Sequence, residues 1–256
     1  MSSERHGKMR TSLLLTVLMV LMTQVGYLDV LNTWSEGDHT LDETNDVLET
    51  GGSGSSFAYA NDKVAAGNEH TCAILENGDL KCWGYDYYGQ LGDGGSPTNT
   101  NAPSSTAIDL GTGRTAVAVS AGVLHTCAIL DNGDLKCWGR DNYGQLGDGG
   151  SNTNTDAPSS TAIDLGTGRT AVAVSAGLSH TCAILDNGDL KCWGQDYYGQ
   201  LGDGGSSTNT NAPSSTAIDL GTGRTAVAVS AGTHHTCVIL DNGDPVSYTH
   251  LTLPTT

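Results

Sequence analysis

Seven cysteines and a recurring histidine are the residues whose types and spacing could do chemistry in this chain. Six of the cysteines form pairs ten residues apart, and the pairs recur every 55 residues: Cys72 and Cys82, Cys127 and Cys137, Cys182 and Cys192. Cys237 begins a fourth pair whose partner position holds Ser247. A histidine stands two residues before the first cysteine of each pair. Thiols in this pattern can form disulfides, stay buried and reduced, or bind a metal together with the histidines.

The segment between two paired cysteines predicts a β-hairpin. Its loop reads Glu76-Asn77-Gly78, or Asp-Asn-Gly in later copies, as in a type I turn followed by a left-handed glycine in a G1 bulge. A three-residue loop of this kind makes Cys72 face Cys82 at a non-hydrogen-bonded pair, with Cα atoms roughly 4.5 Å apart. A two-residue turn would instead place Trp83 opposite Cys72. We therefore expect a disulfide within each of the three complete pairs.

Free buried thiols and a metal site are the alternatives. Ten residues between cysteines is not the spacing of a zinc ribbon, and a pair of strands cannot readily surround a tetrahedral ion. Disulfides persist in exported proteins, whereas thiols of cytosolic proteins stay reduced. The choice therefore depends on where the protein resides.

The N-terminal segment favours export. Arg5, Lys8 and Arg10 precede an apolar run from Leu13 to Met22, which is shorter than the roughly 20 residues of a membrane-spanning helix and matches a secretory signal. We expect residues 1–26 to be a signal peptide or N-terminal anchor, and the protein to be secreted or held at the cell surface. A buried helix of the mature fold is the alternative. Residues 27–62 are acidic and end in a Gly/Ser run, which predicts a linker.

Residues 63–244 form an array of repeats, and one unit can be taken from Gly67 to Ala121. After the hairpin come a turn-rich segment, a polar loop, and two further candidate strands, Thr106 to Leu110 and Thr115 to Ser120. Glycine is abundant and phenylalanine occurs once, which is typical of short strands and tight turns. Four strands in each unit, repeated radially, predict an all-β fold of the β-propeller type with four-stranded blades.

Three short motifs recur in every complete unit: Ala-Gly-x-x-His-Thr before the hairpin, Trp-Gly at its end, and Gly-Gln-Leu-Gly after it. In the first unit they lie at Ala66 to Thr71, Trp83-Gly84 and Gly89 to Gly92. In these motifs the chain resembles the RCC1-like repeat family, of the regulator of chromosome condensation type, from about Lys63 to Asp244. The resemblance implies blades of a usually seven-bladed propeller. It also implies protein binding through loops on the propeller faces, as in nucleotide exchange on a small GTPase or inhibition of secreted enzymes.

The array holds three complete units and the start of a fourth, so we expect about three to four blades of an incomplete ring. The pattern stops at Pro245, and residues 245–256 form a non-repeat tail that lacks the expected Cys and Trp-Gly. A genuine terminus, a truncated reading of a longer gene and foreign sequence are all compatible with this tail.

Composition and repetition argue against several functions. The chain has 11 basic and 28 acidic residues, a formal net charge of −17, which repels nucleic acids. Each candidate site recurs in every unit, whereas catalysis needs different groups at one place, so we expect neither an enzyme nor a cofactor. Exchange activity is not expected from an exported, acidic array with few units.

The recurring side chains each allow a structural and a functional interpretation. The histidines could ring a channel and bind a metal, or could hydrogen-bond a loop within their own blade. The tryptophans are expected to pack between neighbouring blades rather than to stack on sugars. Asp86 and Asp93 could bind calcium, or could be solvated turn carboxylates.

Differences among the units mark candidate partner-binding residues. They fall after Trp-Gly and in the two residues before each recurring histidine, and the six chosen positions are Tyr85, Tyr87, Arg140, Asn142, Gln195 and Tyr197. Loops and aromatic side chains on a rigid scaffold make adaptable contacts, although drift at exposed sites would also produce such differences. The sequence therefore predicts an exported protein-interaction module, with membrane contact only through an uncleaved N-terminal segment. A structural or adhesive surface protein without a discrete site, and a calcium-dependent binder, are the alternatives.

Overall fold

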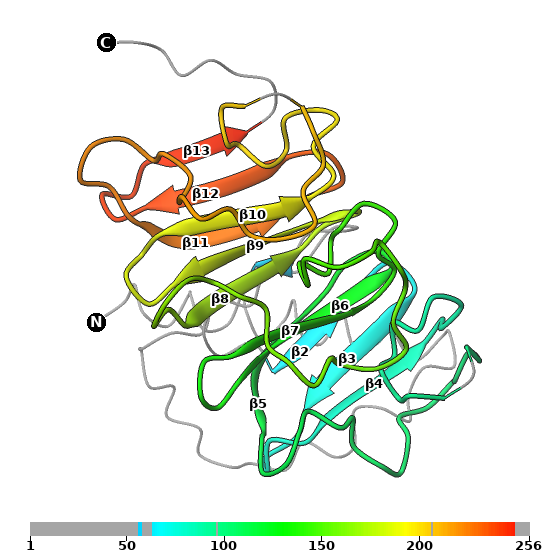
Figure 1. The fold of residues 1–256 in the computed structure, drawn as a ribbon. Helices are drawn as coiled ribbons and strands as arrows, with labels where there is room; N and C mark the ends of the chain where they lie inside the picture. Colours follow the sequence, from blue (N-terminus) through cyan, green and yellow to red (C-terminus); the bar gives the residue numbers. More distant parts are fainter. Residues whose placement is uncertain (1–55, 58–62, 96, 206, 249–256) are drawn as a thin grey trace, which may run out of the picture. The chain divides into compact units, whose positions relative to one another are not determined.

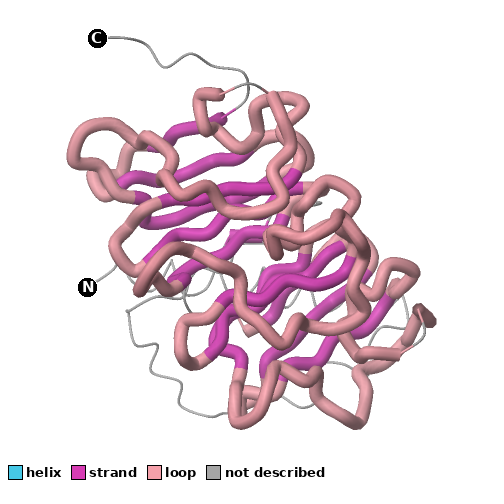
Figure 2. The backbone as a smooth tube through the Cα atoms, viewed as in Figure 1, coloured by secondary structure: helices cyan, strands magenta, loops and turns pink. Residues whose placement is uncertain are grey.

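Short antiparallel strands and the loops between them make up the described chain, which contains no helix (Figure 2). The computed structural model describes residues 56–57, 63–95, 97–205 and 207–248, all of which belong to one unit, Thr50–Thr256. The predicted all-β class is confirmed. Residues 1–26 and 249–256, and most of residues 27–62, lie outside the described residues, so the predictions made for them stay predictions.

Four sheets follow one another in chain order, each built on three consecutive antiparallel strands (Figure 1). In sequence order the four sets are β2 (Val64–Ala66), β3 (His70–Ile74) and β4 (Leu80–Gly84); β5 (Ala116–Ala121), β6 (His125–Leu130) and β7 (Leu135–Gly139); β8 (Ala171–Ala176), β9 (His180–Leu185) and β10 (Leu190–Gly194); β11 (Ala226–Ala231), β12 (Thr236–Leu240) and β13 (Pro245–Tyr248). The short strand β1 (Ser56–Phe57) also pairs with β11.

The hairpins have the register that their turns predict. Cys72 stands opposite Cys82, and the same pairing recurs between β6 and β7 and between β9 and β10. The third loop residue, Gly78, has a φ of 83°, a conformation that costs glycine little and other residues more. The backbone N–H of Leu75 donates to Asp79 at 2.8 Å and closes the loop.

Each sheet combines parts of two sequence repeats, which corrects the prediction that the strands of one unit form one blade. The strand β5, which ends the first repeat, pairs with the hairpin β6–β7 of the second. Only residues 122–124 connect β5 to β6, whereas residues 85–115 separate β4 from β5. Antiparallel neighbours joined by a short connection pair most readily, so the strand joins the hairpin that follows it.

The predicted strand from Thr106 to Leu110 is wrong: three of the described sheets have three strands, and the last has a fourth only because β1 adds to it. The segment lies beside β4, but Ile108 supplies its one ladder bond, donating to the Leu80 carbonyl at 2.9 Å. Its polar residues bond locally instead, since Ser104 Oγ accepts from the Thr106 N–H at 3.2 Å. Such side-chain-to-backbone bonds compete with sheet pairing. Ile108 and Leu110 still bury their side chains in the core.

The hydrophobic core lies between consecutive sheets. One cluster joins Cys72, Ile74 and Leu80 of the first sheet to Leu130 and Trp138 of the second, and two equivalent clusters join the later sheets. Each of the first three sheets therefore has a cysteine-bearing side and a tryptophan-bearing side, and the cysteine side of one sheet packs on the side of the next that carries Trp138, Trp193 or, in the fourth sheet, Tyr248. We call each such contact a sheet junction.

The tryptophans fill these junctions, as predicted. Trp138 and Trp193 are 0% exposed, whereas Trp83 of the first sheet is half-buried. In the fourth sheet Tyr248 pairs with Thr236 as Trp138 pairs with Thr126, and it lies against Gly202 as Trp138 lies against Gly92. Residues 245–248, assigned from the sequence to a non-repeat tail, thus form the third strand of that sheet.

Candidate functional site

The paired cysteines form the bridges Cys72–Cys82, Cys127–Cys137 and Cys182–Cys192 in the structure, with S–S distances of 2.01, 2.08 and 2.07 Å. All six are buried in the sheet junctions. Cys237 is free and exposed, with its sulfur 3.5 Å from the Ser247 hydroxyl. Each bridge ties the two strands of one hairpin together on the side that faces the next sheet.

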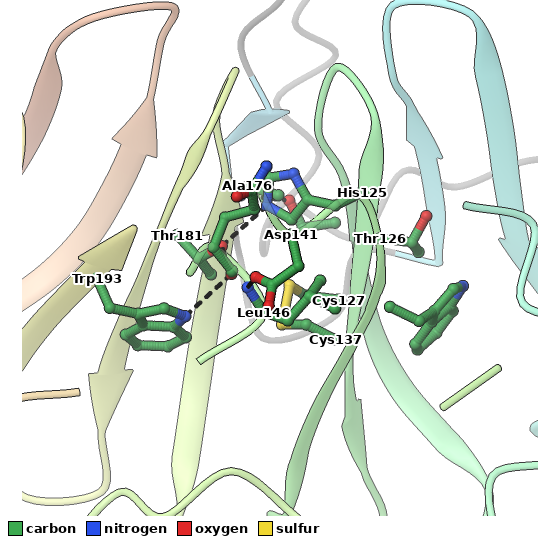
Figure 3. The surroundings of a disulfide bond; sticks show 12 residues. His125, Thr126, Cys127, Cys137, Asp141, Leu146, Ala176, Thr181 and Trp193 are labelled. Atoms are coloured by element: carbon green, nitrogen blue, oxygen red, sulfur yellow. Dashed lines mark hydrogen bonds between the residues drawn. A yellow bond between two sulfur atoms is a disulfide. The ribbon is translucent and has the colours of Figure 1, made fainter. Parts of the chain in front are cut away.

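The recurring histidines reach across the junctions, so the expectation of a bond within their own blade is wrong. His70 Nε2 lies 2.8 Å from the Thr126 hydroxyl, which donates to the Gln90 carbonyl at 2.8 Å. That hydroxyl therefore accepts from the histidine, which fixes the Nε2–H tautomer. The indole N–H of Trp138 donates to the same Gln90 carbonyl at 3.1 Å. The next junction repeats the arrangement with His125, Thr181 and Trp193 beside the Cys127–Cys137 bridge (Figure 3).

Burial keeps these histidines neutral. It lowers the pKa of His70 to about 4 and the pKa values of His125 and His180 to about 3. Each histidine also leaves Nδ1 buried without a hydrogen-bond partner. The described residues contain no group of three or more His, Cys, Asp or Glu side chains placed to bind a metal ion. His70, His125 and His180 each contact a threonine of the next sheet.

Hydrogen bonds from buried polar side chains fix the backbone of the loop after each Trp-Gly. In the first unit the Asp86 carboxylate accepts from the Leu91 N–H at 2.9 Å, and the Asp86 N–H donates to Asn99 at 2.9 Å. The Tyr88 N–H donates to the Gln90 side chain at 3.0 Å. The second and third units repeat all three bonds. The loop backbone is thus the same in each unit, whatever residues stand at its tip.

The aspartates considered as calcium ligands are used within these loops. Asp86 and its counterpart Asp141 are buried, and burial raises the pKa of Asp141 to about 6 and that of Asp86 above its usual range. Asp93 Oδ1 accepts from the Gly95 N–H at 2.9 Å. These carboxylates hold turns of the backbone.

The positions that differ among units lie side by side. Tyr85 donates its backbone N–H to Glu69 at 2.8 Å, Arg140 donates to Leu124 at 2.9 Å, and Gln195 donates to Ser179 at 2.8 Å. The residue after Trp-Gly therefore lies against the variable pair that precedes the histidine. Sequence reasoning singled out both sets, and the structure places them together.

The variable pairs of successive sheets also form one continuous arc. The Asn68 N–H donates to the Gly122 carbonyl at 3.4 Å, Val123 to Gly177 at 3.2 Å, and Leu178 to Gly232 at 3.3 Å. We call the surface made by these connections and the adjoining loops the variable face. Its members are residues 68–69, 85–88, 123–124, 140–143, 178–179, 195–198 and 233–234.

Exposed aromatic rings occupy much of this face. Tyr87 is 66% exposed, with ring centroids 6.3 Å from Tyr85 and 5.1 Å from Tyr88. Tyr197 is 71% exposed and contacts Tyr198. Asn142, which replaces these tyrosines in the second unit, is also exposed, and Gln195 is half-buried. All six predicted partner-binding residues thus belong to the variable face.

Two contacts on the face cross from one sheet to the next. The guanidinium carbon of Arg140 lies 5.4 Å from the ring centroid of Tyr88 in the preceding unit and 5.9 Å from that of Tyr143 in its own. Tyr198 lies 4.6 Å from His234. Tyr88, Tyr143 and Tyr198 were missed from the sequence because they are identical in all three units, whereas the search was for differences. His234 was noted only as part of a variable pair.

Two equivalent cavities beneath the long loops, one beside Lys81 and Ser104 and the other beside Lys136 and Ser159, each measure about 30 Å³. That volume holds about one water molecule. Across the part of the chain described here, nothing has the length and apolar character of a membrane-spanning helix.

Comparisons with known proteins identify the repeat. Two models of the regulator of chromosome condensation (RCC1) repeat match, one at residues 62–90, 116–145 and 171–200, the other at 77–129, 132–184 and 187–239. The ultraviolet-B receptor UVR8 of Arabidopsis thaliana is 32% identical over 186 residues, which are 71% of this chain and 39% of the receptor. The human E3 ubiquitin-protein ligase HERC2 is 34% identical over 147 residues, 56% of this chain and 3% of the ligase.

Solved structures show the same fold. Yeast RCC1 (Prp20) in its complex with Kap60 superimposes with a TM-score of 0.60 at 21% identity, covering 73% of this chain and 43% of the other. Human WBSCR16 gives a TM-score of 0.61 at 22% identity, covering 73% and 46%. The chain thus spans less than half the length of these relatives. With one repeat model matching over more than half of its residues, the chain belongs to the RCC1 repeat family, and its sheets are blades of an RCC1-type β-propeller.

Proposed function

We propose that this chain is an exported protein-interaction module that binds a protein partner through the variable face. The observation that carries the proposal is the contrast within each loop. A backbone fixed by buried hydrogen bonds presents exposed tyrosines and an arginine that change from unit to unit. Tyrosine and arginine are the residues that most often dominate binding energy at protein interfaces.

The repeat family supports binding as the function. The yeast RCC1 structure is a complex with a second protein, Kap60, and UVR8 is a receptor. The chain covers only part of each of these proteins, so their partners do not identify the partner of this chain. We assign the array no catalytic step, no cofactor and no nucleic-acid ligand. A net charge of −17 opposes nucleic-acid binding.

Export is the second part of the proposal. Three disulfides in the structure are compatible with an oxidising compartment, where such bonds persist. The basic and apolar residues at the N-terminus are those of a secretory signal. A reporter enzyme active only outside the cytoplasm, fused after residue 62, tests this part: we expect activity, and its absence with the fusion present in the cytoplasm contradicts export.

Capture from the extracellular fraction of the source organism tests the binding proposal. We expect the immobilised 256-residue chain to retain a saturable partner, and Tyr87→Ala with Tyr197→Ala to reduce retention at least about tenfold, as hot-spot tyrosines do. Val117→Ser with Val227→Ser is the matched control. These valines are 41% and 56% exposed but lie near the starts of β5 and β11, away from the variable face. If retention is unchanged in the tyrosine variant, or falls equally in the control, the proposal is contradicted and a structural or adhesive array is favoured.

A further inference from the structure

We propose that Arg140 is the anchor of the variable face and that it receives a carboxylate from an Asp or Glu side chain of the protein partner. This inference rests on the proposed function and adds the chemistry of the contact. It assigns one residue of one unit, since the equivalent positions hold Tyr85 and Gln195.

The guanidinium is held in place before any partner arrives. It lies within cation–π distance of Tyr88 in one unit and Tyr143 in the next. The Arg140 backbone is itself bonded to Leu124, and the N–H groups of both tyrosines are held by glutamine side chains beneath them. An anchor that is already ordered loses less conformational entropy on binding.

The same guanidinium lacks an acidic partner within the described chain. The other described arginines each pair with an aspartate: Arg114 with Asp131 at 3.3 Å, Arg169 with Asp186 at 3.2 Å, and Arg224 with Asp241 at 3.3 Å. No described carboxylate lies within ion-pair distance of Arg140, and its buried Nε atom has no hydrogen-bond partner. In a chain of net charge −17, with acids far in excess, this arginine stays unpaired.

The surroundings indicate which anion would fit. A guanidinium that contacts aromatic rings through its face keeps its in-plane N–H donors, which match the two oxygens of a carboxylate. Val123 and Leu124 beside it are half-buried apolar residues, so the complementary segment carries its acid next to apolar or aromatic residues. A phosphate carries nearly two charges and is usually met by a cluster of cations, whereas Arg140 is the one Lys or Arg among the residues of the variable face. A single carboxylate therefore fits better than a phosphate.

Peptide selection against the folded 256-residue chain tests the anchor without knowledge of the natural partner. A random dodecapeptide library is selected on the wild-type protein, and the binders are synthesised with amidated C-termini, so that every carboxylate comes from a side chain. Binders that Tyr87→Ala weakens are retained as ligands of the variable face. We expect these to share an Asp or Glu beside an apolar or aromatic residue.

Affinities for matched variants give the decisive comparison. Arg140→Gln should weaken binding roughly tenfold or more, the effect of losing a hydrogen bond to a charged group. The fold tolerates this change, since Gln195 stands at the equivalent position. Arg114→Gln, which removes an arginine from an exposed ion pair elsewhere, should change affinity less than about twofold. Replacing the peptide's acid by its amide should abolish the difference between wild type and Arg140→Gln.

Three results would overturn the anchor: face-binding peptides without an acid, equal affinity for wild type and Arg140→Gln, or tighter binding when phosphoserine replaces the acid. Each of these leaves the proposed function standing, because the peptides still depend on Tyr87. If no selected peptide depends on any residue of the variable face, the proposed function fails as well.

Discussion

At the sheet junctions the three complete units use the same residues, whereas on the variable face the same backbone carries different ones. All three junctions repeat the buried contact from histidine to threonine. The first two also repeat the bond from tryptophan to a glutamine carbonyl, and in the third Tyr248 takes the place of the tryptophan. The loops of the face repeat their internal hydrogen bonds but not their exposed tips. The two regions lie within a few residues of each other in every unit.

The difference separates stability from recognition. A junction residue touches a closely similar surface in every copy, so a change there disturbs packing wherever it occurs. A tip residue touches solvent, so it can change without cost to the fold. The unit thus keeps its architecture constant while a few loop positions vary, and the following measurements test how complete that division is.

The largest effect is expected at a junction tryptophan. Trp138→Ala removes a fully buried ring and its hydrogen bond to Gln90, and should lower the free energy of unfolding by about 3–5 kcal/mol. Trp83→Ala, at the half-buried equivalent, should cost clearly less, and Tyr197→Ala on the face should stay within about 0.5 kcal/mol. Urea denaturation of the three variants measures this order. If Trp138→Ala and Tyr197→Ala lowered the free energy of unfolding equally, the distinction between junction residues and variable-face residues would be wrong.

Next in size is the loss of a disulfide. Replacing Cys127 and Cys137 by serine should lower the free energy of unfolding by about 3 kcal/mol, because the unfolded chain regains the entropy of a short closed loop. The wild-type protein should show one reactive thiol, Cys237, when denatured without reductant, and seven with it. Seven reactive thiols without reductant would mean that the bridges do not form. Partner binding should survive the serine pair at temperatures where the protein remains folded.

Near neutral pH the smallest effect is that of a moderate fall in pH, and it grows as the pH falls further. Because burial depresses the pKa values of His70, His125 and His180 below their ordinary value of 6.5, their contribution to stability is complete above pH 6.5 and is lost as the pH falls toward about 4 to 3. Each histidine should cost up to about 1.4 kcal/mol per pH unit in that range. Burial raises the pKa of Asp141 from 3.8 to about 6, so the folded state binds a proton there before the unfolded state does. Between pH 6 and 3.8 this group therefore raises the free energy of unfolding as the pH falls, against the effect of the histidines.

Variants assign the pH dependence to the junctions. His125→Gln should flatten the fall in unfolding free energy between pH 6.5 and 5, measured by urea denaturation. The control Tyr197→Gln changes an exposed side chain of the variable face, outside the junctions, and should leave the slope as it is. A slope that is the same in His125→Gln and wild type would remove the histidine junctions as its cause.

The local parts of the fold were predictable from the sequence. The Asn-Gly turn fixes the loop length, the loop length fixes the register, and the register places Cys72 opposite Cys82, as observed. The tryptophans were correctly assigned to the contacts between blades because a large ring repeated in each unit needs a buried position. Each of these inferences uses residues close together in the chain.

The predictions failed where competing local bonds or contacts between units decide the structure. The assignment of a strand to Thr106–Leu110 overlooked the local bonds of Ser104 and Thr106. The hydrogen-bond partner of His70 lies 56 residues away, in another sheet, and no pattern of neighbouring residues in the sequence indicates it. For the candidate site, the variable residues were found as differences between copies, but their contact with the invariant Tyr88 and Tyr143 required the structure.

The offset between repeat and sheet bears on how such a chain can grow. Each of the later sheets begins after one long loop and ends before the next. The segment that could be removed or duplicated as a whole sheet therefore runs from one long loop to the next, not from one sequence motif to its next copy. An in-frame deletion or duplication of 55 residues with its breakpoints in those loops removes or adds one whole sheet and recreates the same junction chemistry on both sides. Recombination between near-identical units can therefore change the number of blades, and with it the set of loop tips, without any compensating mutation in the core.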